Sequence, residues 1–394
     1  MIRKLLCVLL AGLFIILSGC WSSNEVNELA LSVAMGLDKT ADGYLLTEQI
    51  INPKAVAAKN PTDSAPVTLY TSQSSNIEVA INNLLLKSSR LIYNTHLRLV
   101  VLGEELAREG IMDILDFFTR SYEFRTDFIF LIAKDSTAYE ILKNLTSLDS
   151  IPGVSLFNMA KHSSEENGMT KAVRVIELIN SIASDGTNAV ITGVNVQKED
   201  IRSYSVDAFK DTDKFDRLAF IGLGAFNEDK LVGWLNLDES KGYNYITDKL
   251  KYTAESAKVD DAEISYNVIK PKAKIKVDIT DGKPSISVDI KLRYSIPEIS
   301  GGYDVSVPDK LGSVSKALED KITGSCNAAI TKAQKEIKAD IFGFGEAVHR
   351  KDKKYWSTVK DKWNDEFIKM PVNITVKAEL INTGEISKSY FKKD

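Results

Sequence analysis

The first 21 residues constrain this chain most, because they resemble an export leader that would be removed from the folded protein. Arg3 and Lys4 are followed by thirteen uncharged residues, 5–17. This is the layout of a secretory signal peptide. Thirteen helical residues span only about 20 Å, which is too short for a bilayer hydrocarbon core of about 30 Å. We therefore expect residues 1–19 to be cleaved rather than to form a permanent membrane span.

The leader ends in Leu17-Ser18-Gly19-Cys20, which resembles a bacterial lipobox. In such a motif the cysteine sulfur receives a diacylglycerol, and cleavage then leaves Cys20 as the first residue of a lipoprotein that carries palmitate-like chains. Two acyl chains anchor a protein stably, whereas one chain holds it only marginally. We therefore predict lipidation of Cys20. The alternative is an ordinary signal peptide that a cysteine follows by chance.

The other cysteines cannot form a disulfide framework. Cys7 leaves with the leader and Cys20 is lipidated, so Cys326 remains alone. An exported protein of this kind must therefore be stabilised by packing. Cys326 falls on the apolar face of a predicted helix, and we interpret it as a small core residue rather than a reactive thiol.

The charge balance argues against nucleic acid as a partner. The chain has 50 Lys+Arg and 54 Asp+Glu, and loss of Arg3 and Lys4 with the leader leaves 48 against 54, a net charge of −6. A mildly acidic chain lacks the basic surface that nucleic-acid binding needs. The mature chain also exceeds the roughly 250 to 300 residues at which single cores stop growing. We expect several domains.

Strand and helix patterns alternate through the first half of the chain. Period-2 apolar alternation or short apolar runs predict strands at residues 29–37, 44–51, 67–71, 97–102, 127–133 and 189–196. Helical periodicity predicts helices at residues 77–85, 104–119, 136–145 and 170–183, the second interrupted at Gly110. This interleaving is typical of an α/β domain, although it does not fix the strand order.

The remaining sequence predicts hairpins and long helices. Strands at 218–226 and 230–235 form one hairpin; strands at 273–279 and 286–294 form another across Asp281-Gly282. Helical patterns follow at 311–341 and 353–369, and a strand follows at 372–380. We expect an antiparallel sheet that is covered on one face by helices.

The predicted fold class is therefore α+β (mixed α/β) and multidomain. We divide the chain into a signal peptide (1–19), an N-terminal α/β region (20–195), a connecting β region (196–245) and a C-terminal α+β domain (246–394).

The sequence contains no recognisable enzyme motif. His96, His162 and His349 have no cysteine or carboxylate at a zinc spacing. We interpret His96 as a hydrogen-bonded structural residue and the other two as solvated. No metal or cofactor is predicted.

Two glycine pairs and two acidic pairs are interpreted as parts of turns and loops rather than as functional motifs. Gly222-Leu223-Gly224 and Gly343-Phe344-Gly345 lack the third glycine of a dinucleotide loop, and we interpret both as turns. Glu165-Glu166 and Asp260-Asp261 lie in polar sequence that suggests loops, without the sheltered environment that acid catalysis requires. We therefore predict no catalytic residue.

Two further groups of residues have structural interpretations. Charged residues between 120 and 127 either pair within the first domain or face a partner, and we favour pairing: Arg120, Glu123, Arg125 and Asp127. The Trp356 and Trp363 stripe is interpreted as a helix face in the core.

Blocks of residues in a fixed order resemble the Ger(x)C spore germination lipoproteins. These are Cys20-Trp21 with Glu25, Leu29 and Gly36-Leu37-Asp38; His96-Leu97-Arg98 with residues 103–107, Gly110, Arg120, Glu123 and Arg125; Gly224-Ala225-Phe226 with residues 230–235 and 239–242; and residues 340–345 with Trp356, Trp363, Phe367 and Gly384. The blocks span nearly the whole mature chain. One departure is Ser23-Asn24, where the family often has a basic pair.

The resemblance implies the C subunit of a germinant receptor, held by its lipid on the outer face of the spore inner membrane. It implies A and B receptor subunits as partners, an indirect link to the nutrient germinant, a mixed α/β fold and no enzyme activity. The alternative is a solute-binding lipoprotein of a small-molecule transporter, which needs two similar lobes around a deep polar cleft. A third hypothesis, a cell-wall hydrolase, needs convergent carboxylates or a histidine dyad.

Overall fold

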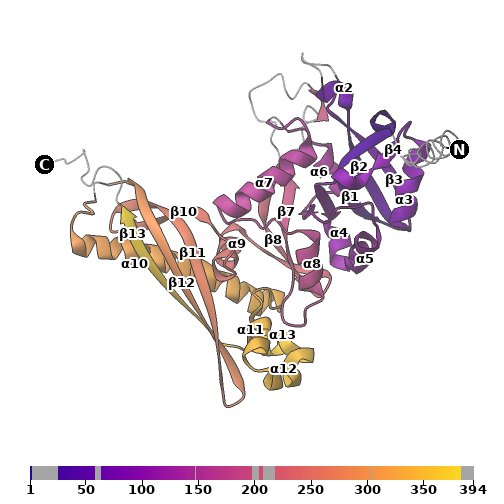
Figure 1. Ribbon diagram of the computed structural model, residues 1–394. Coiled ribbons are helices and arrows are strands. Elements are labelled where there is room, and N and C mark those ends of the chain that lie inside the picture. The colour runs from indigo at the N-terminus through magenta and orange to yellow at the C-terminus, as the bar shows by residue number, and fades with distance from the viewer. Residues whose placement is uncertain are drawn as a thin grey trace.

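The computed structural model describes residue 1 and residues 25–57, 64–146, 148–197, 204–206, 218–301 and 303–382. The chain forms two lobes (Figure 1). The first lobe is drawn from indigo to magenta and the second mostly in orange and yellow.

The first lobe is built on a nine-stranded sheet in the order β3-β2-β1-β5-β6-β7-β8-β9, with β4 paired to β1. Its strands are β1 (Leu29–Thr40), β2 (Gly43–Ile51), β3 (Val67–Ser74), β4 (Leu91–Tyr93), β5 (Leu99–Gly103), β6 (Ile129–Ala133), β7 (Val190–Val196), β8 (Leu218–Asn227) and β9 (Lys230–Leu235). Strands β1, β5, β6 and β7 are parallel, and antiparallel pairs flank them on both sides. The parallel strands β5 and β6 are fully buried, as sheets covered on both faces require.

Helices cover both faces of this sheet. They are α2 (Pro53–Val56), α3 (Ile77–Asn83), α4 (Glu104–Glu109), α5 (Met112–Arg120), α6 (Ala138–Lys143), α7 (Pro152–Glu166) and α8 (Val175–Ile182), with short 3-10 turns η1 (Val26–Glu28), η2 (Leu84–Leu86) and η3 (Asn94–His96). Apolar residues of α3, α4, α5 and α8 form one core cluster with the sheet. Residues of α6 and α7 form another on the opposite face. The predicted α/β region is therefore a covered sheet.

The predicted helix at 104–119 is interrupted as expected. The α4 helix ends at Gly110, whose φ of +137° is a conformation that favours glycine. A Cβ at this position would lie 2.5 Å from Oδ2 of Asp229, which accepts from the Met112 N–H at the start of α5. The break therefore connects α5 to the β8–β9 turn.

The second lobe contains a four-stranded sheet in the order β10-β11-β12-β13. Its elements are α9 (Leu237–Ile246), β10 (Tyr252–Val259), β11 (Ala262–Thr280), β12 (Lys283–Ile299), α10 (Pro308–Lys332), η6 (Ala333–Ile337), α11 (Phe344–Lys351), α12 (Lys353–Val359), η7 (Lys360–Lys362), α13 (Trp363–Phe367) and β13 (Val372–Asn382). The predicted hairpin turn is confirmed, with positive φ at both Asp281 and Gly282. The sheet departs from the prediction at one pair, because β13 lies parallel to β12.

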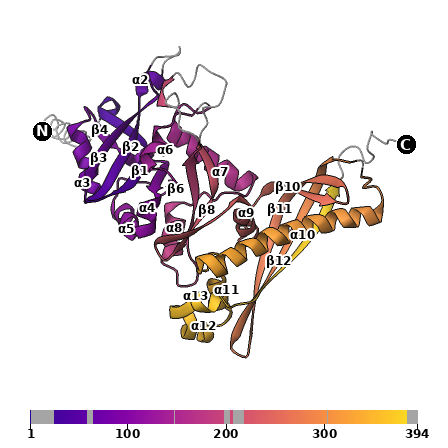
Figure 2. The same ribbon diagram turned by 180° about the vertical axis from the view of Figure 1, so that it is seen from behind.

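The long helix α10 packs along one face of this sheet (Figure 2). Its buried residues recur every three or four positions and include Val314, Leu318, Ile322 and Cys326. The predicted helix at 311–341 is too long, because the chain continues from α10 into a single π-helical segment and then leaves the helix at Lys338, which is left-handed at φ +58°. The predicted helix at 353–369 is likewise divided into α12, η7 and α13.

Buried polar contacts join the two lobes. Asn244 of α9 donates to the carbonyls of Gly168 and Thr170, at 2.7 and 3.0 Å. The Glu346 N–H donates to the Gly186 carbonyl at 3.1 Å. The strands β8 and β9 belong to the first sheet, and residues of both contribute to the core of the second lobe. The proposed domain boundaries at 195 and 245 remain predictions.

Candidate functional site

The predicted lipidation site lies outside the described residues. Cys20 and Trp21 fall within residues 2–24, and Gly384 falls within residues 383–394, of which the structure describes none. The prediction for Cys20 therefore stays a prediction. Within the described residues, no helix combines the length and apolar character needed to cross a membrane.

The three histidines lie in unrelated places. His96 is exposed, its ring centroid lies 5.8 Å from that of Tyr93, and it makes no side-chain hydrogen bond to a described residue. The expected hydrogen-bonded role of His96 is therefore wrong. His162 is exposed on α7, as expected, whereas His349 is half-buried and stacks on Trp356 with ring centroids 5.5 Å apart.

The glycine and acidic pairs need three corrections. Gly222 and Gly224 lie inside β8 rather than in a turn. A register shift in the β7–β8 pair and a φ of +117° at Gly222 indicate a β-bulge. Glu165 and Glu166 lie on α7 rather than in a loop, and Glu165 pairs with Lys251 at 3.0 Å. Gly343 is left-handed directly before α11, whereas Gly345 lies inside α11 rather than in a turn. Asp260-Asp261 forms the β10–β11 turn.

The interpreted core and surface residues largely follow expectation. Cys326, Trp356 and Trp363 are buried in the second lobe, and burial raises the pKa of the Cys326 thiol. Arg120 pairs with Asp116 of its own helix. Arg125 approaches Asp127 at 3.6 Å.

Buried acids act as structural centres. Asp340 accepts hydrogen bonds from the Trp363 indole at 2.9 Å and from three backbone N–H groups, including Gly345 at 2.7 Å. Burial raises the pKa of Asp340, and these donors oppose the shift. The division of the predicted 353–369 helix places Trp363 at this contact. Asp340 thereby fixes the α11–α13 cluster at the base of the second lobe (Figure 1).

A buried ion pair connects α9 with β10. Lys241 Nζ lies 3.2 Å from Glu255 Oε1, and their side chains are only 7% and 3% exposed. The Tyr245 hydroxyl also donates to Glu255 at 3.0 Å, and Lys241 donates to the Ala254 carbonyl. A carboxylate with two donors in such a site is satisfied and fixed in position. We assign this group a structural role.

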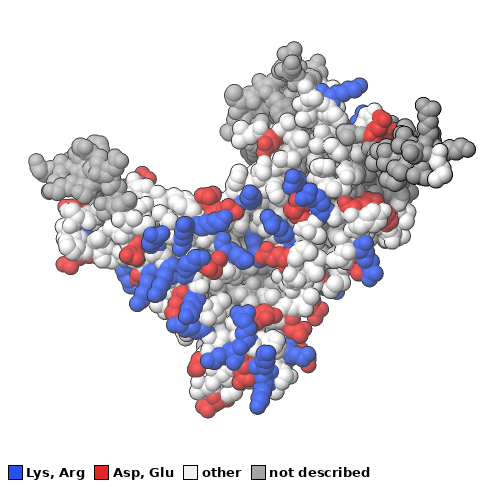
Figure 3. All heavy atoms as spheres, viewed as in Figure 1, with Lys and Arg blue, Asp and Glu red and all other residues white. Residues whose placement is uncertain are grey.

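The open face of the second sheet is basic. Lys272, Lys291 and Lys377 lie opposite one another on β11, β12 and β13, and all three are exposed. Figure 3 shows a band of Lys and Arg over this part of the molecule. Lys272 approaches Asp248 at 3.4 Å. Like charges in register are unfavourable in a sheet, so this row lowers the stability of the second lobe.

A groove in the first lobe lies beside the start of β1. It has a volume of about 460 Å³ and is bounded by α3, η2, β4, η3 and the segment after α5. The lining residues are Leu29, Glu78, Ile81, Asn82, Leu85, Leu91, Ile92, Tyr93, Asn94, Thr95, Tyr122 and Glu123. A second cavity of about 440 Å³ shares three of them, Glu78, Tyr122 and Glu123. The two cavities therefore adjoin each other at these three residues.

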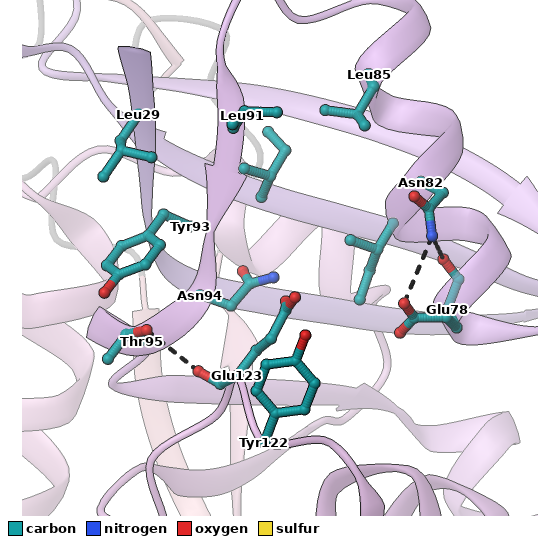
Figure 4. A pocket seen from close by; sticks show the side chains of 12 residues that line it. Leu29, Glu78, Asn82, Leu85, Leu91, Tyr93, Asn94, Thr95, Tyr122 and Glu123 are labelled. Carbon is teal, nitrogen blue, oxygen red and sulfur yellow. Dashed lines mark hydrogen bonds between the residues drawn. The ribbon is translucent and has the colours of Figure 1, made fainter. Parts of the chain in front are cut away.

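The floor of this groove contains an unsatisfied amide. Asn94 is 1% exposed, and neither Nδ2 nor Oδ1 of its side chain has a hydrogen-bond partner among the described residues. Leaving a buried polar group unpaired costs roughly 1–3 kcal/mol. Figure 4 shows Asn94 between Tyr93 and Glu123, with the Glu78 carboxylate and the Tyr122 hydroxyl across the same space. This is the least satisfied polar site on the groove.

Two family models match the chain and together cover most of it. The model described as "Spore germination protein N-terminal domain" matches residues 22–196. The model described as "Spore germination B3/ GerAC like, C-terminal" matches residues 221–384. The chain belongs to the Ger(x)C family of spore germination proteins. The sequence resemblance is therefore confirmed.

Ger(x)C relatives match over almost their full lengths. Spore germination protein KC of Bacillus subtilis (strain 168) is 31% identical, over 98% of this chain and 97% of that protein. Spore germination protein B3 of the same organism is 24% identical, over 94% of this chain and 96% of that protein. The crystal structure of the GerBC protein covers 88% of this chain and 97% of its own, with a TM-score of 0.56 and 21% identity. The shared fold confirms the predicted mixed α/β, multidomain class.

The groove lined by Glu78, Asn94 and Glu123 was not predicted from the sequence. Glu78 and Glu123 are separated by 45 positions, and Asn94 lies in a short polar segment between them. The one local signal is the sequence Tyr93-Asn94-Thr95, in which Tyr93 ends the strand β4 and two polar residues follow it directly. Nothing in the spacing indicates that these residues converge.

Proposed function

We propose that this protein is a lipid-anchored, non-enzymatic C subunit of a nutrient germinant receptor. In this proposal it is required for spore germination and acts in receptor assembly and signal transmission. Its partners are the A and B receptor subunits, and it lies on the outer face of the spore inner membrane. The observation that carries the proposal is the full-length relationship to spore germination proteins.

The buried acids of the second lobe have structural partners, which supports a scaffold role for this lobe. The buried acids Asp340 and Glu255 are occupied by structural donors. An anchor would keep this rigid body near its membrane partners and raise its effective concentration, so that weak contacts suffice.

The architecture favours this role over a solute-binding lipoprotein. A binding protein of that type closes two lobes around a ligand. Here one lobe has a nine-stranded mixed sheet and the other a four-stranded sheet. Direct polar contacts, such as Asn188 Nδ2 to the Asp340 carbonyl at 3.3 Å, hold the lobes together.

Gene deletion tests the receptor role. A strain that lacks this gene, and any redundant receptor, should grow normally but lose germination in response to one defined nutrient. Complementation with the intact gene should restore the response. Normal germination with every nutrient in the deletion strain would refute the role.

The anchor is tested separately by Cys20→Ala. The variant should fold but lose membrane retention and receptor function. Cys326→Ala is the matched control, because Cys326 is buried in the core and should not affect retention. Unchanged retention of Cys20→Ala, in the absence of partner subunits, would refute lipidation.

A further inference from the structure

The groove around Asn94 is built to receive a donor and an acceptor at once. Asn94 Oδ1 accepts and Nδ2 donates, so one amide group can satisfy both atoms. The Asn94 side chain is not needed for local structure, because the turn is closed by the Leu97 N–H donating to the Asn94 backbone carbonyl at 3.0 Å. The unsatisfied side chain of this residue, which is 1% exposed, therefore points to a ligand that carries an amide.

The groove is also negatively charged and has no cation of its own. Glu78 and Glu123 line it, whereas no Lys or Arg does. Glu123 forms no ion pair with a described residue, and the Glu78 carboxylate accepts only from Asn82 at 3.5 Å within α3. Arg120, at the edge of the adjoining cavity, is held by Asp116 at 2.7 Å. Two carboxylates are thus left for a cationic group.

The opposite end of the groove is apolar. Leu85 and Leu91 line it and are 41% and 44% exposed. Figure 4 places Leu29, Leu85 and Leu91 at the end away from Glu123 and Tyr122. Exposed leucines in a concave site can bury an aliphatic side chain. The volume of about 460 Å³ lies within the range of small-ligand sites.

We propose that this groove binds a primary ammonium group next to an amide and an aliphatic side chain. This chemistry belongs to an amino-acid amide and to the first residue of a peptide. The ammonium pairs with Glu78 and Glu123, the amide pairs with Asn94, and the aliphatic group packs on Leu85 and Leu91. A free amino acid fits less well, because its carboxylate cannot donate to Asn94 Oδ1 and is repelled by the two glutamates. The proposal does not depend on the receptor role.

The probe is L-leucinamide, titrated into residues 20–394 with Cys20→Ala. This form keeps every described helix and strand. Calorimetry or ligand-observed NMR should detect saturable binding of L-leucinamide. N-acetyl-L-leucinamide, which lacks the charge, and L-leucine, which lacks the amide, should each bind about tenfold more weakly or not at all. Leucylglycinamide, a peptide, should bind at least as well as L-leucinamide if peptides are the natural source.

Variants identify the site. Glu78→Gln with Glu123→Gln should weaken L-leucinamide binding about fivefold to tenfold. Asn94→Leu should weaken it about tenfold, and its thermal melt should show that it folds. Glu105→Gln is the control, because Glu105 is exposed on α4 and does not line the groove.

The results that would overturn the proposal are specific. They are equal binding of L-leucinamide and its N-acetyl form, equal binding of L-leucine, the same loss in Glu105→Gln as in the groove variants, or no saturable binding. Because binding is measured on the isolated chain, a negative result leaves the receptor proposal intact. Conversely, failure of the deletion experiment leaves the groove proposal intact.

Discussion

Replacement of Glu48 by glutamine should remove a fall in the free energy of unfolding that the chain otherwise shows as the pH rises through neutrality. Glu48 lies on β2 and is fully buried, and Ser32 of β1 donates to one carboxylate oxygen. The other oxygen, Oε1, has no hydrogen-bond partner among the described residues. Burial raises the pKa of this carboxyl from 4.5 to about 8, and the Ser32 hydrogen bond lowers it only in part.

The direction in which stability changes with pH follows from the protonation of Glu48 in the folded and the unfolded chain. Below pH 4.5 the carboxyl is protonated in both the folded and the unfolded chain, so the stability is full. Between pH 4.5 and about 8 the unfolded chain ionises whereas the folded chain keeps the proton, so stability falls as pH rises. Each pH unit costs about 1.4 kcal/mol, which gives about 3 kcal/mol at pH 7 and about 5 kcal/mol in total.

Glutamine removes this titration. The free energy of unfolding of Glu48→Gln should resemble that of the unsubstituted chain near pH 4.5 and exceed it by about 3 kcal/mol at pH 7. Urea unfolding at several pH values measures the difference. Glu105→Gln, at an exposed position, should show no such trend. A difference that stays constant from pH 4.5 to 8 would show that Glu48 does not titrate in this range.

Three further changes test the packing. Lys241→Met should lower the free energy of unfolding by about 3–5 kcal/mol, because it leaves the buried Glu255 carboxylate without its cation. Adding Glu255→Gln to this variant should restore part of the loss. An unchanged free energy of unfolding in Lys241→Met would contradict the buried ion pair. Lys291→Gln should raise the melting temperature by about 1–2 °C at low salt and leave it unchanged at high salt, because it removes the repulsion of Lys291 from Lys272 and Lys377. A change in melting temperature that does not depend on salt would argue against this repulsion. Gly222→Ala should strongly lower the free energy of unfolding, because the new Cβ would lie 2.1 Å from the Leu235 carbonyl oxygen. Gly312→Ala on α10, where a Cβ would meet no atom within 4 Å, should raise the free energy of unfolding by about 1 kcal/mol. Equal effects of the two substitutions would refute the close approach at Gly222.

The spacing of apolar residues was sufficient to predict an element and its core residues wherever one face of that element is buried. The β11–β12 hairpin follows from apolar alternation and the Asp281-Gly282 turn, and the core position of Cys326 follows from helical spacing on α10. Both signals are local, because burial of one face imposes its own period on the sequence. The interruption at Gly110 was predicted from a different local signal, a glycine inside a helical pattern.

Features that depend on distant residues could not be predicted in this way. The parallel pairing of β13 with β12 is decided by how α10 to α13 return the chain, and alternation alone is the same for either direction. The π-helical segment after α10 contains the apolar residue Ile337, so periodicity continued through it without a break. The groove joins Asn94 with Glu78 and Glu123 only after η3 packs beside α3 and the segment after α5.

The most direct test of the receptor assignment is co-purification from spore membranes. A functional, tagged copy of this protein should be recovered from the detergent-solubilised inner membrane together with A and B receptor subunits. The same preparation from a strain with Cys20→Ala should yield little of the complex. Recovery of a transporter's components in place of the receptor subunits, or of the protein alone under conditions that preserve other receptors, would contradict the account.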